Sequence, residues 1–350
     1  MNFHPDLLKT VDGLKKLMTI TPGDTVVNPA RITTGSLALD VVLGGGWPTD
    51  TWSEIIGEAS SGKTAICLKT IAANQEKDPD FVAVWVAAEN WFPEWAAICG
   101  VDTSRVIVVQ TNIMEDAYQA VIKICESKQV DLVVIDSLPA LTPSTEDEKN
   151  MDEMTVGRGA LLTNKFFRKI AVAQQREEGE KQVAGILINQ FRMKIGVMHG
   201  DPRTTPGGLG KDYAMSIRAE VKRDEWIEAG TGTAKRRIGQ AIKLHTIKNK
   251  TYPPQQTGYV DFYVAEGGAV DPGQFDFAKE IISLGIVHGV IERRGGWLYY
   301  THVGGGADGA DDPRKWHGGD AMLASIREEV FLAEALTKEV LDVLLIGEKK

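Results

Sequence analysis

The segment from residue 57 to residue 64, Gly-Glu-Ala-Ser-Ser-Gly-Lys-Thr, constrains the fold of this chain more than any other part of its sequence. It fits the pattern G-x-x-x-x-G-K-[ST], in which glycines let backbone N–H groups turn inward around a phosphate. The run Glu54-Ile55-Ile56 before it predicts a short buried strand, and residues 65–73 after it predict a helix. Because a helix N-terminus adds positive potential where phosphates bind, the three elements together indicate a nucleoside triphosphate site. A glycine-serine linker that matched the pattern by chance would lack the strand and the helix.

Two side chains of this loop carry distinct chemistry. Lys63 would pair with the β- and γ-phosphates, and the hydroxyl of Thr64 would bind Mg²⁺. The rest of the loop would hold the phosphates with its backbone, so the expected nucleotide-binding residues are Gly57, Glu58, Ala59, Ser60, Ser61, Gly62, Lys63 and Thr64.

The composition excludes several classes of protein. No apolar run approaches the roughly 20 residues that a membrane span needs, and the N-terminus lacks the pattern of a signal peptide. Cys67, Cys99 and Cys125 lie far apart in apolar stretches, so we expect reduced core thiols and a cytoplasmic protein. The net charge of −9 argues against a nucleic-acid partner, although a local basic surface can coexist with acidic regions elsewhere.

Hydrophobic periodicity predicts an α/β architecture. Residues 5–19 carry apolar side chains at helical spacing, which predicts an amphipathic arm within residues 1–32. Near-continuous apolar runs then alternate with helical patterns over residues 33–270, as in a mostly parallel sheet covered by helices. The expected strands are 54–56, 81–86, 106–109, 132–135 and 183–188, and the expected helices are 63–74, 91–99, 114–127 and 157–178. Residues 271–350, with a long helix expected over 318–345, predict a small C-terminal α/β domain.

Polar residues that follow the predicted strands are candidates for the same site. Asp136 ends an apolar strand where Mg²⁺ would need a carboxylate, although a solvated strand-end Asp has the same pattern. Glu89 could activate the water that attacks the γ-phosphate, or it could simply stabilise a helix N-terminus. Trp95 could stack on an adenine ring, but the pattern alone favours core packing. Gln190 could sense the γ-phosphate, or it could be a structural cap.

The segment from residue 189 to residue 218 is long and rich in glycine and cations. Loops of this length are usually functional or disordered. Its cations, with Ile195 and other apolar side chains between them, are typical of a surface that contacts phosphates and inserts between bases, although a solvated basic loop is the plain alternative.

The chain resembles the RecA family of bacterial and phage recombinases. The resemblance spans nearly the whole length and rests on residues 32–40, on the loop 57–64, on residues 133–143 and on residues 188–200. It implies a RecA-like P-loop ATPase core with an N-terminal helix arm and a small C-terminal domain. It also implies an ATP- and Mg²⁺-dependent helical filament on single-stranded DNA that pairs homologous duplex DNA and exchanges strands, with DNA-stimulated ATP hydrolysis and ATP between subunits.

The resemblance also implies roles for individual residues. Glu89 would activate water, Gln190 would sense the γ-phosphate, and Asp136 would assist Thr64 with Mg²⁺. Trp95 would take the position of the aromatic residue that stacks on adenine. Lys248 and Lys250 would reach the ATP of the neighbouring subunit and neutralise charge there; without the resemblance they read as a solvated turn. The helix at 5–19 would dock on the next subunit.

The resemblance places DNA in two loops, at about 147–158 and 191–211. The second loop would insert Ile195 between bases, and the first would insert Val156. The expected DNA-binding residues are Val156, Arg158, Arg168, Arg192, Met193, Lys194, Ile195, Gly196, Gly207, Gly208 and Lys211. Arg293 and Arg294 would offer cations to incoming duplex.

Two other functions compete with a strand-exchange ATPase. A hexameric helicase or motor could share the core, although the loop at 191–211 and the C-terminal domain argue against it. A filament or scaffold protein that binds ATP without hydrolysing it would not need Lys63, Thr64, Glu89 and Asp136 together.

Overall fold

The computed structural model describes residues 29–147, 157–175, 179–193, 202–302 and 311–347. The chain divides into two compact units, Met1–Ala30 and Arg31–Lys350, and the fold described below is that of the second. The helix expected at 5–19 lies outside the described residues. None of the helices in the described ranges is long and apolar enough to cross a membrane.

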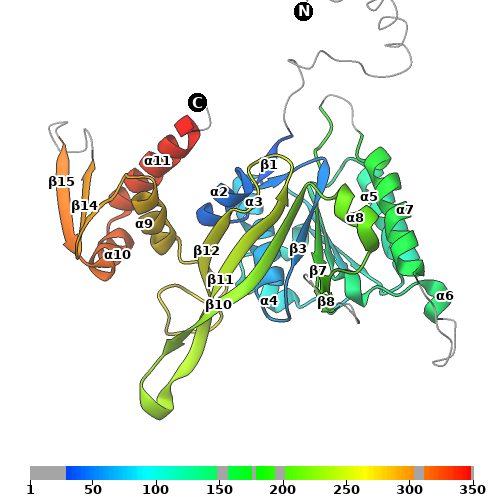
Figure 1. Cartoon of the computed structure of the whole chain (residues 1–350), viewed down its shortest axis with the longest axis horizontal. Helices are drawn as coiled ribbons and strands as arrows, with labels where there is room; N and C mark the ends of the chain where they lie inside the picture. Colours follow the sequence, from blue (N-terminus) through cyan, green and yellow to red (C-terminus); the bar gives the residue numbers. More distant parts are fainter. Residues whose placement is uncertain (1–28, 148–156, 176–178, 194–201, 303–310, 348–350) are drawn as a thin grey trace, which may run out of the picture. The chain divides into compact units, whose positions relative to one another are not determined.

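One eight-stranded sheet organises the second unit, in the order β12-β11-β10-β3-β7-β6-β4-β5 (Figure 1). The six strands from β10 to β5 run parallel, and β11 and β12 add an antiparallel extension to β10. The strands are β3 (Thr51–Ile56), β4 (Ala83–Ala87), β5 (Val106–Gln110), β6 (Leu132–Asp136), β7 (Ala184–Asn189), β10 (Ile217–Ala229), β11 (Arg236–Asn249) and β12 (Thr257–Tyr263). The mostly parallel sheet expected from the apolar runs is therefore confirmed.

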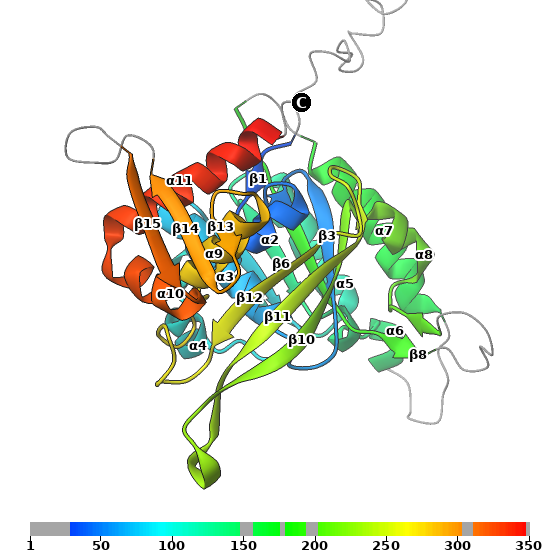
Figure 2. The same ribbon diagram turned by 60° about the vertical axis from the view of Figure 1, so that its left-hand side comes forward.

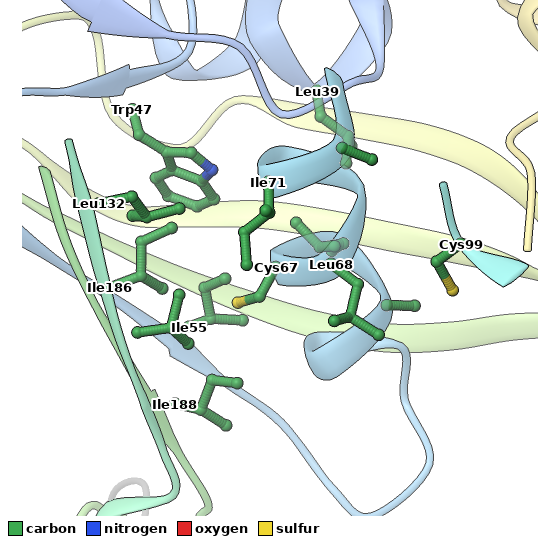
Figure 3. Close-up of a cluster of buried hydrophobic side chains, with 14 of the residues drawn as sticks. Leu39, Trp47, Ile55, Cys67, Leu68, Ile71, Cys99, Leu132, Ile186 and Ile188 are labelled. Atoms are coloured by element: carbon green, nitrogen blue, oxygen red, sulfur yellow. The ribbon is translucent and has the colours of Figure 1, made fainter. Parts of the chain in front are cut away.

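Side chains alternate between the two faces of this sheet and build a separate core on each. One core packs against α2 (Leu37–Leu43), α3 (Lys63–Lys77) and α4 (Pro93–Ile98). Figure 3 shows Cys67, Leu68 and Ile71 of α3 beside Leu132, Ile186 and Ile55 of the sheet. The other core packs against α5 (Met114–Glu126) and α7 (Arg158–Ala173), with α8 (Gly208–Ala214) beside α7.

Short elements complete the region around the sheet. A two-stranded ribbon pairs β1 (Arg31–Ile32) with β2 (Trp47–Pro48), and a second pairs β8 (Arg192–Met193) with β9 (Arg203–Thr204). A short helix, α6 (Ser144–Asp147), follows a 3-10 turn at Leu138–Ala140. The β8–β9 ribbon and α8 occupy the described part of residues 189–218, so this segment carries more regular structure than the single loop that the sequence suggested.

The C-terminal residues have a hydrophobic cluster of their own, which includes Ile281, Leu298 and Leu336. Helices α9 (Phe277–Val287), α10 (Gly319–Glu328) and α11 (Val330–Gly347) pack on one face of a three-stranded sheet of β13 (Glu292–Arg294), β14 (Trp297–His302) and β15 (Asp312–His317), which Figure 2 shows from another side. The domain boundaries at 32/33 and 270/271 stay a prediction.

Two helix predictions were wrong in their extent. The single helix expected over 318–345 is two helices, because Glu329 adopts an extended conformation between α10 and α11. The helix expected over 157–178 ends at Ala173, and its last turn is closed by the backbone of Gln174 donating to Ile170.

We expect Phe166 to be a main contributor to the stability of the second core. Its ring is 2% exposed, stacks on Tyr118 at 4.3 Å between ring centroids, and meets Trp52 edge-on at 5.3 Å. Phe166→Ala should lower the free energy of unfolding by about 3–5 kcal/mol, because it removes buried area and leaves a cavity. Urea denaturation measures this change. Leu161→Ala on the same helix, where the side chain is 70% exposed, should change stability by less than about 0.5 kcal/mol. Equal losses for both variants would contradict this assignment.

Candidate functional site

The carboxyl ends of β3, β7, β6 and β4 meet at one edge of the sheet, because these four strands are adjacent and parallel. The segments that leave this edge contain the phosphate loop, Gln190, Asp136 and Glu89 respectively. Ligands of open α/β sheets bind outside the carboxyl ends of the strands. Four candidates chosen separately from the sequence thus lie along one edge of the sheet.

The phosphate loop turns between β3 and α3, which begins at Lys63. Gly62 has φ +103°, a left-handed conformation that side chains rarely adopt. A Cβ on Gly57 would lie 2.2 Å from the backbone oxygen of Val221, so only glycine fits there. The hydroxyl oxygen of Ser61 is buried without a hydrogen-bond partner among the described residues. A buried polar atom of this kind is what a phosphate-binding loop needs to offer its ligand.

The ammonium group of Lys63 turns back onto the backbone of the phosphate loop. Its ammonium donates to the backbone oxygens of Gly57 at 3.0 Å and Glu58 at 2.6 Å. Burial lowers the pKa of Lys63, and the nearby carboxylates of Asp136 and Glu89 oppose that shift. The side chain is therefore a largely desolvated cation beside two acids, and a triphosphate would strengthen its charged form.

Thr64 and Asp136 contact each other directly. The Thr64 hydroxyl donates to Oδ2 of Asp136 at 3.1 Å. Burial, and after it the charge of Glu89, raises the pKa of Asp136 from 3.8 to about 6. A hydroxyl and a carboxylate are oxygen ligands of the kind that Mg²⁺ takes, with phosphate oxygens and water completing an octahedron. No three His, Cys, Asp or Glu side chains of the described ranges converge on a metal position.

Glu89 is oriented by the strand beside it. The Ser137 hydroxyl donates to its Oε1 at 2.6 Å, and the backbone N–H groups of Ala88 and Glu89 donate to the oxygen of Asp136 at 3.0 and 3.1 Å. Two carboxylates are thus held on neighbouring strand ends with separate partners. This arrangement leaves Asp136 beside Thr64 and Glu89 beside Ser137; their roles as metal ligand and general base stay predictions.

Gln190 follows β7, the strand between that of the phosphate loop, β3, and that of Asp136, β6. Its backbone N–H donates to the side-chain oxygen of Asn189 at 2.9 Å, and the backbone oxygen of Asn189 accepts from Gly57 at 3.3 Å. The candidate sensor is therefore linked to the phosphate loop through one residue.

Trp95 lies on α4 and packs partly buried against the core. Its ring meets Phe262 edge-on at 6.3 Å between centroids. This contact agrees with the packing alternative, and a stacking role toward adenine stays a prediction.

Lys248 and Lys250 do not point into the phosphate loop of their own chain. Both lie at the end of β11, where Lys248 donates to the backbone oxygen of Asp212 at 2.6 Å and Lys250 donates to that of Tyr213 at 3.0 Å. Both carbonyls belong to the last part of α8. A role of these lysines at a neighbouring subunit is compatible with this position and stays a prediction.

Several expected DNA-binding residues lie around one cavity of about 340 Å³. Arg158 begins α7, Arg192 lies in β8, and Gly207 precedes α8; all three line the cavity, together with Met114, Pro143 and Thr163 among others. Arg158 and Arg192 are exposed, as is Met193. The exposed Arg168 lies further along α7 and Gly208 begins α8; neither lines the cavity. Val156, Lys194, Ile195 and Gly196 lie outside the described residues.

Lys211 needs a different assignment. Its side chain is fully buried, and its ammonium pairs with Glu54 and with Asp212 and also donates to the hydroxyl of Thr205. Three partners use all three of its N–H groups, so it cannot contact a DNA phosphate in this arrangement. The structure therefore places Lys211 in a buried polar cluster.

The centre of that cluster, Glu54, was missed as a functional candidate. A glutamate in a strand buried on both faces is unusual unless it is paired, and Glu54 stands three residues before the phosphate loop. That signal was present in the sequence. The partners of Glu54, however, are Lys211, Arg218 and Asn189, which only the fold brings together.

Comparison with known proteins gives consistent matches. The family model of the RecA N-terminal domain matches residues 10–269. Protein RecA of Lactococcus lactis subsp. cremoris (strain MG1363) is 36% identical over 290 residues, which cover 82% of this chain and 72% of that protein. Protein RecA of Thermotoga neapolitana is 35% identical over 329 residues, 93% of this chain and 88% of that protein. A crystal structure of the RadB recombinase aligns at 17% identity with a TM-score of 0.48, over 68% of this chain and 97% of that one.

We predict that the buried carboxyl of Asp136 makes stability depend on pH. Because its pKa is raised to about 6 in the folded chain, folding favours the protonated form, and the free energy of unfolding should fall as pH rises from about 4 to about 6. Asp136→Asn removes this dependence and should be more stable than the wild type at pH 7.5 by about 2–3 kcal/mol without nucleotide. Urea denaturation from pH 4 to pH 8 measures it. Below pH 4 the two proteins should converge; identical profiles at every pH would refute the prediction.

Proposed function

The chain belongs to the RecA family and is a RecA-type recombinase, and from that premise we propose that it assembles with ATP and Mg²⁺ on single-stranded DNA and exchanges strands with homologous duplex DNA. The proposal includes a helical filament with ATP between subunits and ATP hydrolysis that DNA stimulates. One observation carries it: the phosphate loop, Asp136, Glu89 and Gln190 share one edge of the sheet, and Gln190 leads directly into the segment expected to bind DNA. The cytoplasmic location expected from the sequence stays a prediction.

The residues of the phosphate loop would bind and orient the triphosphate. Lys63 would exchange its two backbone partners for phosphate oxygens, and the loop N–H groups would surround the β-phosphate. Thr64 and Asp136 would hold Mg²⁺, which supplies neutralisation of the developing phosphate charge. Glu89, kept in place by Ser137, would accept the proton of the attacking water.

The DNA surface is proposed around the cavity between α7, β8 and α8. Arg158 and Arg192 are exposed cations at its wall, where each can contact a backbone phosphate. Phosphate contacts do not distinguish sequences, as a protein that must accept any strand requires. Two of the three charged residues that line the cavity are arginines although the whole chain carries a net charge of −9, so total charge does not decide the partner.

Lys248 and Lys250 are proposed to act across a subunit boundary. Cations supplied in trans to a phosphoryl-transfer site stabilise its transition state and make turnover depend on assembly. Their ammonium groups donate to carbonyls of α8, the helix that begins within the last part of the loop 191–211 expected to bind DNA. DNA bound at that segment can therefore influence these lysines through a single short helix.

We predict that single-stranded DNA stimulates ATP hydrolysis by the wild type. Lys63→Ala should lower DNA-stimulated turnover by about 100-fold or more, because it removes charge stabilisation from the transition state. Phosphate release with and without a poly(dT) strand measures both values. Turnover that ignores DNA would favour a motor of another kind, and no turnover by the folded wild type would favour a scaffold that only binds ATP.

We predict that Arg192 contributes one phosphate contact to the DNA complex. Arg192→Ala should make the dependence of log K on log salt concentration shallower by about 0.7, the value for one phosphate of a single strand. Fluorescence anisotropy of labelled poly(dT) at increasing NaCl, with a slowly hydrolysed ATP analogue, measures the slope. Lys77→Ala, at an exposed lysine in the last turn of α3 on the opposite side of the sheet, should keep the wild-type slope. An unchanged slope for Arg192→Ala would remove this residue from the interface.

A further inference from the structure

Glu54 is an ionisable side chain in the middle of the sheet, with no exposed surface. It lies on β3 between β7 and β10, three residues before Gly57. Its Oε1 accepts from Lys211 and, at 2.7 Å, from the side-chain amide of Asn189; its Oε2 accepts from Arg218 at 2.6 Å. A buried carboxylate is tolerated only when it is paired and hydrogen-bonded in this way.

The three donors reach Glu54 from three different functional segments. Asn189 ends β7 and contacts Gln190, the candidate sensor of the γ-phosphate. Lys211 belongs to α8, which begins within the last part of the loop 191–211 expected to bind DNA, and Arg218 is the second residue of β10. Asn189 also donates to the backbone oxygen of Pro206 at 3.1 Å, where the described part of the DNA segment returns to the sheet. One carboxylate therefore joins the phosphate-loop strand, the sensor strand and the end of the DNA segment.

The same cluster continues to the two lysines of β11. Asp212 accepts from Lys211 at 2.7 Å and lies 3.2 Å from Arg218 through its Oδ1, while its backbone oxygen accepts from Lys248 at 2.6 Å. The position of α8 thus sets the position of the carbonyls that hold Lys248 and Lys250. Figure 1 shows α8 beside α7.

In the direct ion pairs around Glu54, cations and carboxylates are equal in number. Two cations, Lys211 and Arg218, face two carboxylates, and of these Glu54 is fully buried whereas the side chain of Asp212 is 26% exposed. Neutralising Glu54 leaves one positive charge without a buried partner, and networks of this kind lose their defined geometry when one member is missing.

We propose that Glu54 is a positioning residue that couples DNA binding to the ATP site. It holds α8, Asn189 and Arg218 in fixed positions relative to one another. Movement of the DNA segment is thereby transmitted to Gln190 and to Lys248 and Lys250. This inference rests on the proposed function. Glu54 itself contacts neither ligand, and its role is to make the two binding events depend on each other. Coupling between two sites is reciprocal: if ATP strengthens DNA binding by some factor, DNA strengthens ATP binding by the same factor.

The experiment measures this factor directly, with Glu54→Gln in the full-length chain. The affinity for labelled poly(dT) is determined with and without a slowly hydrolysed ATP analogue, and nucleotide affinity is determined with and without poly(dT). The wild type should show a coupling factor of about 10 or more, within the usual range of about 5–150. Glu54→Gln should reduce the coupling factor to less than about 3, whether it is measured from DNA affinity or from nucleotide affinity. Each ligand alone should bind this variant within about threefold of its affinity for the wild type.

Two further variants make the result specific. Glu280→Gln is the same substitution at another buried glutamate, whose contacts are Ser36 and Ala38, and it should keep the wild-type coupling. Glu54→Gln combined with Lys211→Met restores charge balance, so it should fold even where the single variant does not, and it should still lack coupling. Thermal unfolding monitored by circular dichroism reports folding of each variant.

The outcomes separate this inference from the function on which it rests. A wild type whose DNA affinity ignores the ATP analogue would overturn the proposed function and this inference with it. A coupled wild type together with a folded, equally coupled Glu54 variant, single or double, would overturn this inference alone. Equal loss of coupling in Glu280→Gln would also overturn it, because the effect would then belong to any buried glutamate.

Discussion

The parallel alignment of adjacent strands is the constraint on which the rest of the structure depends. Because β3, β7, β6 and β4 point the same way, the residues after each strand must gather at one edge. The backbone hydrogen bonds of four neighbouring strands fix their spacing, so the phosphate loop, Gln190, Asp136 and Glu89 need no direct contacts to be held in one row. A rigid sheet of this kind can place charged groups closely without relying on mobile loops.

Burial then determines what these groups can do. Asp136 is held in a poorly solvated position that raises the pKa of its carboxyl to about 6, and Lys63 is held beside it as a largely desolvated cation. A ligand of opposite charge would stabilise the charged form of each group. The free energy that burying these charges costs in the free chain can therefore be regained as affinity for a metal-bound triphosphate. Glu54, on the same strand as the phosphate loop, is instead fully paired within the chain. A carboxylate therefore lies beside the proposed ligand site in one place and is paired within the chain in the other.

The predictions from sequence succeeded where local pattern and fold agree. The five predicted strands all occur, with ends shifted by a few residues, because near-continuous apolar runs have few other ways to be buried. They failed where tertiary contacts override local preference. Residues 318–345 have a continuous helical pattern, yet the chain bends at Glu329 to pack two helices on one small cluster. The long strands β10 and β11 carry many exposed polar residues beyond the sheet (Figure 1), so their sequence pattern did not predict strands.

The sequence by itself determined the phosphate loop, the class of fold and the strand-end acids, because each depends on residues that are neighbours along the chain. Only the tertiary structure decided the partners of charged side chains. Lys211 has the sequence context of a DNA contact, and it lies buried on Glu54, which stands 157 residues away in the chain. The reason is physical: the energy of a charge depends on its solvent exposure and on the charges within a few ångströms, and neither quantity is encoded in local sequence.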